Sequence, residues 1–156
     1  MIQRVQSVYL LLVTVLMSFM LILPYAELTM TDGHLLTFLA HGIEKSVAGE
    51  ASVLYKTTIA VIVLVLITAL LSFGNIFLFS RRILQLRLCL LNITLLLTLL
   101  IIQYVHYSST KSTLEITEHS FRIPAIFPLI SIIFNFLAYR HIHSDEMLVN
   151  SYNRLR

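Results

Sequence analysis

The stretch FSRRILQLRLCLLN, residues 79–92, places three arginines between two long runs of hydrophobic residues. The first run covers residues 57–79 and the second covers residues 86–107. An α-helix needs about 20 mostly apolar residues to cross the roughly 30 Å hydrocarbon core of a membrane, so each run is long enough to span it. The arginine-rich stretch is therefore predicted to form a tight turn between two membrane-spanning helices.

The composition of the whole chain agrees with a membrane protein. Of its 156 residues, 58% are hydrophobic and 12% are charged, whereas about a quarter of the residues in a soluble domain are charged. The formal net charge of +3 comes from basic residues at the ends of apolar runs, so it does not indicate nucleic-acid binding. A chain of this length has room for one small helical bundle and no second domain.

Two further apolar runs cover residues 7–24 and 123–139, which brings the predicted spans to four. Apart from Arg87, at one mouth of the third span, none of the four contains a charged residue. The first run is long for a signal-peptide core, and Pro24 stands where a small residue should precede a cleavage site, so we expect an uncleaved anchor. The expected fold is a single all-α membrane domain, a four-helix bundle with outer loops at 25–56 and 108–122 and a tail at 140–156.

Basic residues are distributed unequally between the loops. Lys and Arg are retained on the cytoplasmic side during insertion, so this asymmetry predicts that both termini are cytoplasmic. The termini and the central turn carry seven arginines, whereas the other two loops carry four basic and six acidic residues. The seven are Arg4, Arg81, Arg82, Arg87, Arg140, Arg154 and Arg156.

Both outer loops contain β-strand signals. Residues 27–39 include the pair Asp32-Gly33, which favours a tight hairpin turn between β-prone flanks. Residues 113–121, TLEITEHSF, alternate apolar and polar side chains and could add a third strand. Since an isolated hairpin is marginal in water, we expect a small extracytoplasmic β-hairpin or three-stranded sheet that caps the bundle.

The tail has the features of a short amphipathic helix. Ser144 is a suitable N-cap, and Asp145 and Glu146 follow in the first turn, where the helix dipole favours negative charge. The two carboxylates are also candidates for ion pairs with the arginines of the central turn. One apolar face of this helix is expected to carry Met147, Leu148, Tyr152 and Leu155.

Polar residues recur inside the spans at spacings of 3, 4, 7 or 11, which place each set on one face of its helix. We expect these faces to point into the bundle. They either make interhelical hydrogen bonds and close-packing contacts or line a path for a small solute. In the first span the set is Ser7, Thr14 and Ser18; in the other three the main members are Ser72, Asn75, Asn92, Gln103, His106, Ser131 and Asn135, with Thr68 and Ala138 beside them.

The residue inventory points away from enzymatic chemistry. It contains no Gly-rich phosphate loop, nucleophile elbow or Cys cluster, and the single Cys89 is expected to be a buried small apolar residue. His34, His41 and His119 could meet on the outer sheet and bind zinc, but a surface role without metal is the preferred interpretation. We therefore expect no catalytic site, no cofactor and no metal.

Three blocks of the sequence resemble a known family. They are MIQRVQSVYLLL (residues 1–12), RRILQLRLCLLN (81–92) and PLISIIFNFLAYRHIHSDEMLVNSYNRLR (128–156). The chain resembles a four-span inner-membrane family of Gram-negative bacteria, catalogued as domain of unknown function 4293. The resemblance covers nearly the whole chain, and it implies a bacterial inner-membrane location and no particular activity.

The blocks that carry the resemblance are basic and amidic, which suits docking against another protein or lipid headgroups. The leading hypothesis is a non-enzymatic accessory or scaffolding subunit of a larger membrane complex, with the lipid bilayer and other membrane proteins as partners and no nucleic acid. The alternative is a small-molecule or lipid carrier that uses the inward polar helix faces. The residues expected to dock or to set topology are Arg4, Arg81, Arg82, Arg87, Asp145, Glu146 and Arg154.

Overall fold

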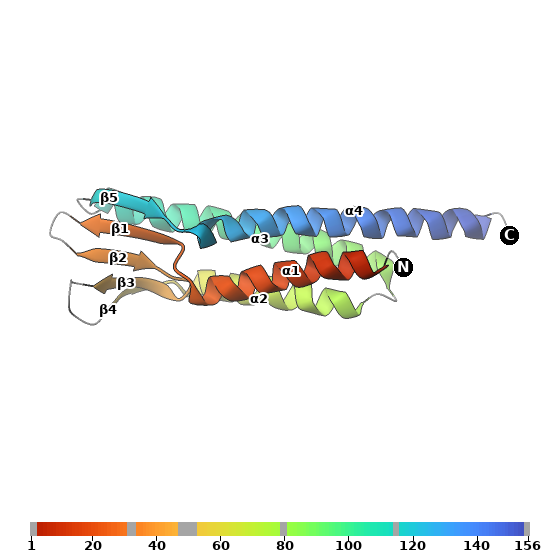
Figure 1. Ribbon diagram of the computed structural model, residues 1–156, viewed down its shortest axis with the longest axis horizontal. Coiled ribbons are helices and arrows are strands. Elements are labelled where there is room, and N and C mark those ends of the chain that lie inside the picture. Colours follow the sequence, from red (N-terminus) through yellow and green to blue (C-terminus); the bar gives the residue numbers. More distant parts are fainter. Residues whose placement is uncertain (1–2, 31–33, 47–52, 79–80, 114–115, 155–156) are drawn as a thin grey trace.

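The computed structural model describes residues 3–30, 34–46, 53–78, 81–113 and 116–154. Four long helices lie side by side along its longest axis (Figure 1). They are α1 (Gln3–Ile22), α2 (Ile59–Phe77), α3 (Arg82–Thr113) and α4 (Phe127–Arg154), the last preceded by a 3₁₀ turn, η1 (Ile123–Ile126). All four are long and apolar enough to cross a membrane, as the hydrophobic runs predict.

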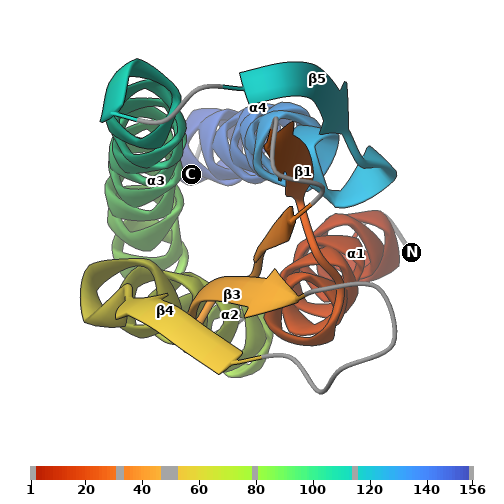
Figure 2. The ribbon, with the colours of Figure 1, turned by 90° about the vertical axis from the view of Figure 1, so that its left-hand side faces the viewer.

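The helices form a ring in which α1 packs against α2 and α4, and α3 packs against the same two neighbours. Figure 2 shows this ring from one end. Successive helices are antiparallel, so the start of α1 and the end of α4 lie at one end of the molecule (Figure 1). We call this the terminal end, and the opposite end the sheet end.

The sheet end carries five antiparallel strands in the order β4-β3-β2-β1-β5. The first four connect α1 to α2, and the fifth connects α3 to η1 (Figure 1). The predicted hairpin is confirmed as the pair of β1 and β2, although its Asp32-Gly33 turn lies outside the described residues. The strands are β1 (Ala26–Met30), β2 (Leu35–Phe38), β3 (Gly42–Ser46), β4 (Val53–Thr57) and β5 (Ile116–Phe121).

The predicted size of the sheet is wrong, because the sheet has five strands instead of two or three. The third predicted strand exists as β5 and pairs with β1. The two unpredicted strands, β3 and β4, extend the hairpin from its other side. In β4 every residue is exposed, so its sequence lacks the alternation of buried and exposed positions that identifies a strand.

One face of the sheet belongs to the same core as the helices. Leu28 and Leu36 are opposite each other in register and buried, as are Phe38 and Ile43. The ring of Phe38 lies 6.3 Å from that of Tyr107 on α3, measured between centroids. Helix α3 continues to Thr113, past the predicted end of the third span at Tyr107.

The predicted start of the tail helix is wrong. Helix α4 runs without a break through Ser144, whose hydroxyl donates to the carbonyl of Arg140 at 3.0 Å instead of capping a new helix. No Gly or Pro separates residue 139 from residue 144, so nothing in the sequence ends the preceding helix. The tail is helical, as predicted, but it is the continuation of the fourth span.

Candidate functional site

The centre of the bundle contains a hydrogen-bonded cluster of three predicted polar residues from three helices. The Asn92 side-chain amide donates to the Ser72 hydroxyl at 2.7 Å and to the Asn135 side-chain oxygen at 3.3 Å. All three side chains are buried. We call Ser72, Asn92 and Asn135 the central polar cluster; it links α2, α3 and α4 by specific bonds within an otherwise apolar interior.

A second set of bonds joins the end of α2 to the start of α3. The side-chain amide of Asn75 donates to the Gln85 carbonyl at 3.3 Å, and the Gln85 side-chain amide donates to the Asn75 carbonyl at 3.2 Å. Asn75 also contacts the sulfur of the buried Cys89 at 3.2 Å. These reciprocal bonds hold the two helices together on either side of the predicted arginine turn, of which residues 79–80 lie outside the described part.

The remaining predicted polar residues make weaker or separate contacts. The Ser131 hydroxyl contacts the Met17 sulfur at 3.6 Å, and the Gln103 amide contacts the Met20 sulfur at 3.9 Å. His106 is half-buried near the sheet end. Since Gln103 lies 11 residues beyond Asn92 on α3, the two are about 16 Å apart along the helix axis. Leu96 and Leu99 are buried between them, so an apolar layer separates Gln103 from Asn92 on the inner face of α3.

The prediction for α1 is wrong at Ser18, which is exposed, and only in part right at Thr14, which is half-buried. Both hydroxyls donate to carbonyls of their own helix, at 3.0 Å from Thr14 and 2.8 Å from Ser18. Such bonds satisfy a hydroxyl that faces lipid, so these residues need no interhelical partner. The buried face of α1 consists instead of Gln6, Leu10, Val13, Met17 and Met20.

Asp145 is the point where the tail meets the rest of the terminal end. Its carboxylate accepts a hydrogen bond from the Gln6 side chain, and its main-chain carbonyl accepts one from the Arg82 guanidinium at 3.2 Å. The predicted ion pair between the tail carboxylates and the turn arginines is not present among the described residues, because Arg82 contacts the backbone instead. Of the other predicted docking residues, Arg81 and Arg87 are exposed and Glu146 is half-buried, whereas the side chains of Arg4 and Arg154 lie outside the described part.

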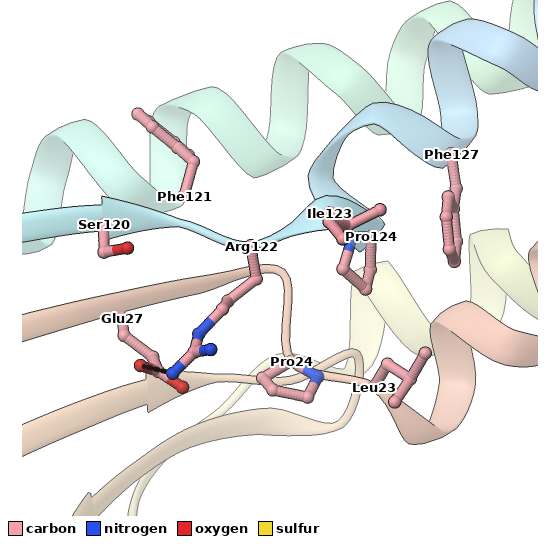
Figure 3. A pocket seen from close by; sticks show the side chains of 9 residues that line it. All are labelled: Leu23, Pro24, Glu27, Ser120, Phe121, Arg122, Ile123, Pro124 and Phe127. Atoms are coloured by element: carbon pink, nitrogen blue, oxygen red, sulfur yellow. Dashed lines mark hydrogen bonds and ion pairs between the residues drawn. The ribbon is translucent and has the colours of Figure 1, made fainter.

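A groove opens at the junction between the sheet and the bundle, with a volume of about 660 Å³. Its two walls are the end of α1 with the start of β1, and the end of β5 with η1 (Figure 3). The Arg122 guanidinium on one wall forms an ion pair with the Glu27 carboxylate on the other. This groove is not predictable from local sequence patterns, because its walls come from segments about 95 residues apart in the chain.

The family described as Domain of unknown function (DUF4293) matches residues 2–155. The chain belongs to this family. The match confirms the resemblance seen in the three sequence blocks and its coverage of nearly the whole chain. No curated protein and no solved structure matches the sequence.

The histidines of this DUF4293 protein do not gather at a metal site in the described part of the chain. No group of three His, Cys, Asp or Glu residues there is arranged to hold a metal ion. His41 lies 3.1 Å from the Glu44 carboxylate, which is a local contact between the residue that precedes β3 and a residue within β3. The side chain of His119 lies outside the described part.

Tyr25, at the boundary between α1 and β1, has a buried hydroxyl with no hydrogen-bond partner among the described residues. A buried polar group without a partner costs about 1–3 kcal/mol. We expect Tyr25→Phe to raise the free energy of unfolding by about 1 kcal/mol, measured by denaturant unfolding in detergent at pH 8. A loss of stability in this variant would mean that the hydroxyl is bonded in solution, and would contradict the prediction.

The same burial gives Tyr25 a distinct pH dependence. Desolvation raises the pKa of Tyr25 from its ordinary 10.0 to about 12, so the folded state keeps the phenolic proton over a range in which the unfolded chain loses it. The contribution of Tyr25 to stability therefore falls as pH rises from about 10 to about 12. The phenylalanine variant should lack this contribution, so the stability difference between the two proteins should widen over that range.

Proposed function

We propose that this protein is a non-enzymatic accessory or scaffolding subunit of a larger complex in the bacterial inner membrane, with both termini cytoplasmic. The proposal rests mainly on the projecting end of α4. A helix that continues beyond its own bundle, and carries apolar side chains there, is suited to contact another protein.

The length of the projection follows from its anchor at Asp145. This residue lies level with Gln6 and Arg82, near the first turns of α1 and α3. Helix α4 continues for nine residues beyond it, to Arg154, which is about 14 Å at 1.5 Å per residue. In Figure 1, α4 accordingly runs past the other three helices at the terminal end. Since its base is bonded to both α1 and α3, the projection has a defined direction.

The projecting segment begins with two exposed apolar residues, Met147 (62%) and Leu148 (63%). Met is flexible and polarisable, and is often used at surfaces that bind other helices. Apolar residues on the lipid-facing sides of the spans are expected in a membrane. Met147 lies beyond Arg140 and Asp145, next to the end of the apolar segment Ile123–Leu148, where its exposed side chain is available to a protein partner.

The charge at the terminal end supports the proposed orientation. Arg81, Arg87 and Arg140 are exposed there, and the terminal end also holds the starts of α1 and α3 and the ends of α2 and α4 (Figure 1). Basic residues near membrane ends mark the cytoplasmic side and interact with anionic headgroups. Docking through α4 would therefore take place on the cytoplasmic face.

The alternative, a small-molecule or lipid carrier, has less support from the interior. A carrier needs polar side chains that are available to a solute, whereas the Asn92 amide donates to both Ser72 and Asn135 and so links three helices. Asn75 and Gln85 are likewise bonded to each other. The side-chain oxygens of Asn75 and Asn92 have no partner among the described residues. The hydrogen bonds that these residues do make favour a structural role for the inward polar faces.

Site-specific photo-cross-linking in native membranes tests the proposal. A photoreactive residue in place of Met147 should give a cross-linked species with another membrane protein. A photoreactive residue in place of Val53, which is equally exposed (68%) on the edge strand β4 at the sheet end, is the matched control and should not give the same species. The adduct should persist when the protein is extracted in mild detergent.

Charge reversal provides an independent readout. Arg81→Glu with Arg82→Glu should reduce recovery of the cross-linked partner or alter the topology of the chain. Cross-linking from Met147 to lipid alone, together with a strictly monomeric protein after extraction, would contradict the scaffold proposal. Labelling of the arginine turn from the periplasm would contradict the orientation.

A further inference from the structure

The groove between the sheet and the bundle is amphipathic. Leu23 and Pro24 form one wall, and Ile123, Pro124 and Phe127 form the other. Figure 3 shows the Arg122 side chain extending from the second wall towards Glu27 across the groove. The apolar lining and the single ion pair at one side give the groove a polar end and an apolar end. Its volume of about 660 Å³ is within the usual range for sites that bind small molecules, about 300–1,000 Å³.

The groove lies at the level where lipid headgroups are found. The apolar part of α1 ends at Ile22, and the apolar part of the fourth span begins at Ile123. Both boundaries border the groove, which therefore lies where the hydrocarbon core gives way to the polar interface. Its apolar end faces the spans and its ion pair faces the sheet. An amphiphile in the membrane has the same order of groups along its length.

Both partners of the ion pair have hydrogen-bonding positions that the pair itself does not use, namely donors on Arg122 and acceptors on Glu27. A guanidinium has five N–H donors, and a carboxylate has about four acceptor positions; one hydrogen bond joins the two groups. The Arg122 side chain is 55% exposed and the Glu27 side chain is 17% exposed, so both remain accessible. Because the two charges cancel, the pair does not favour a purely anionic ligand. It matches a ligand that carries one negative and one positive group.

We propose that this groove binds a phospholipid whose headgroup carries a phosphate and a primary ammonium, of the phosphatidylethanolamine type. The phosphate accepts hydrogen bonds from Arg122, and the ammonium donates to Glu27. One acyl chain lies against Leu23, Ile123 and Phe127. A primary ammonium has three N–H donors, which the quaternary ammonium of phosphatidylcholine lacks, so the groove should distinguish these two zwitterionic lipids.

Native mass spectrometry of the full-length protein in detergent tests this assignment. The protein is titrated separately with phosphatidylethanolamine, phosphatidylcholine and phosphatidylglycerol that carry identical acyl chains. We expect the first lipid to bind about five- to tenfold more tightly than either of the others, which corresponds to about 1–1.4 kcal/mol. Equal binding of all three, or tightest binding of phosphatidylglycerol, would overturn the proposal. This comparison needs no variant.

Two charge variants assign the selectivity to the ion pair. Arg122→Gln should weaken phosphatidylethanolamine binding about tenfold. Glu27→Gln should leave a free guanidinium, so phosphatidylglycerol should become the preferred lipid. Lys56→Gln is the matched control, because it removes an exposed cation from β4, at the opposite edge of the sheet from β5. It should leave the order of lipid affinities unchanged.

A steric variant separates the groove from the ion pair. Ser120 lines the groove and is exposed, and Ser120→Trp should obstruct it without changing a charge. The expected result is loss of selective phosphatidylethanolamine binding, with helical content unchanged by circular dichroism. If selective binding survives both Ser120→Trp and Arg122→Gln, the lipid binds elsewhere and the proposed site is wrong.

Discussion

Asn92→Asp is expected to reduce the free energy of unfolding by about 3 kcal/mol at neutral pH. Asn92 is 2% exposed and supplies both donors of the central polar cluster. A carboxylate can only accept hydrogen bonds, so it would keep a bond to Ser72 only by accepting from the hydroxyl. It would lose the bond to the Asn135 oxygen and place its charge next to that oxygen. An aspartate at the centre of a membrane helix costs about 2.5–3.5 kcal/mol on insertion scales, which sets the size of the effect.

The variant Asn92→Leu is the matched control, since it removes both hydrogen bonds without adding charge. Interhelical hydrogen bonds in membranes contribute about 0.6 kcal/mol each on average, so we expect a loss of about 1 kcal/mol. Unfolding in mixed micelles, followed by circular dichroism at pH 5 and pH 8, compares the two. Protonation makes the aspartate neutral and able to donate, so the aspartate variant should be more stable at pH 5.

The outcome also bears on the proposed function. If Asn92→Asp is no less stable than Asn92→Leu at pH 8, the carboxylate must be hydrated. Water would then reach the centre of the bundle, and the interior polar faces would be accessible to a solute. This result would favour the carrier over the scaffold. A large and pH-dependent loss would support a structural role for the central polar cluster.

The number and positions of the helices could be predicted because the length of an apolar run is a direct physical requirement of the membrane. The ends of the helices could not be predicted in the same way. The predicted third span ends at Tyr107, where hydropathy falls, but α3 continues to Thr113 because no residue between them breaks a helix. Hydropathy marks the edge of the apolar layer, whereas the helix ends where the backbone is interrupted.

The candidate sites depend on contacts that local sequence patterns do not encode. On α2, α3 and α4, most of the predicted polar residues are buried, because an amide inside an apolar helix is best satisfied by a neighbouring helix. On α1 the prediction is wrong at Ser18, since a hydroxyl can bond to its own backbone and face outwards. Gln6 has no such local option; it lies on the buried face and bonds to Asp145 across the bundle.

The groove is the clearest example of a site that could not be predicted from the sequence. Arg122 and Glu27 are unremarkable loop charges when read along the chain. They meet because β5 pairs with β1, which aligns Phe121 with Ala26 and brings Arg122 next to the end of α1. The strand was predicted, but its register was not, and the register decides which charged residues face each other.

Gly42→Ala is expected to destabilise the sheet end by about 2 kcal/mol, as overpacking typically does. A Cβ at Gly42 would lie 2.6 Å from the Lys56 carbonyl oxygen and 2.9 Å from a Leu54 methyl group. The oxygen belongs to the backbone of β4, so the clash cannot be relieved by a side-chain rotation. Strand β4 must move away from β3, which weakens their pairing. Hydrogen–deuterium exchange should show faster exchange of the β4 amides.

The matched control is Gly74→Ala in the interior of α2. A Cβ at Gly74 would meet no described atom within 4 Å outside its own turn of helix, and Ala is preferred over Gly in a helix by about 1 kcal/mol. This variant should be neutral or stabilising, with the exchange rates of the β4 amides unchanged.

The Gly42 variant should also loosen the first turn of α2. Strand β4 leads directly into α2, and the amide of Thr58 donates to the His41 carbonyl at 3.1 Å. Equal stability of the two variants would mean that β4 is not held against β3 in solution.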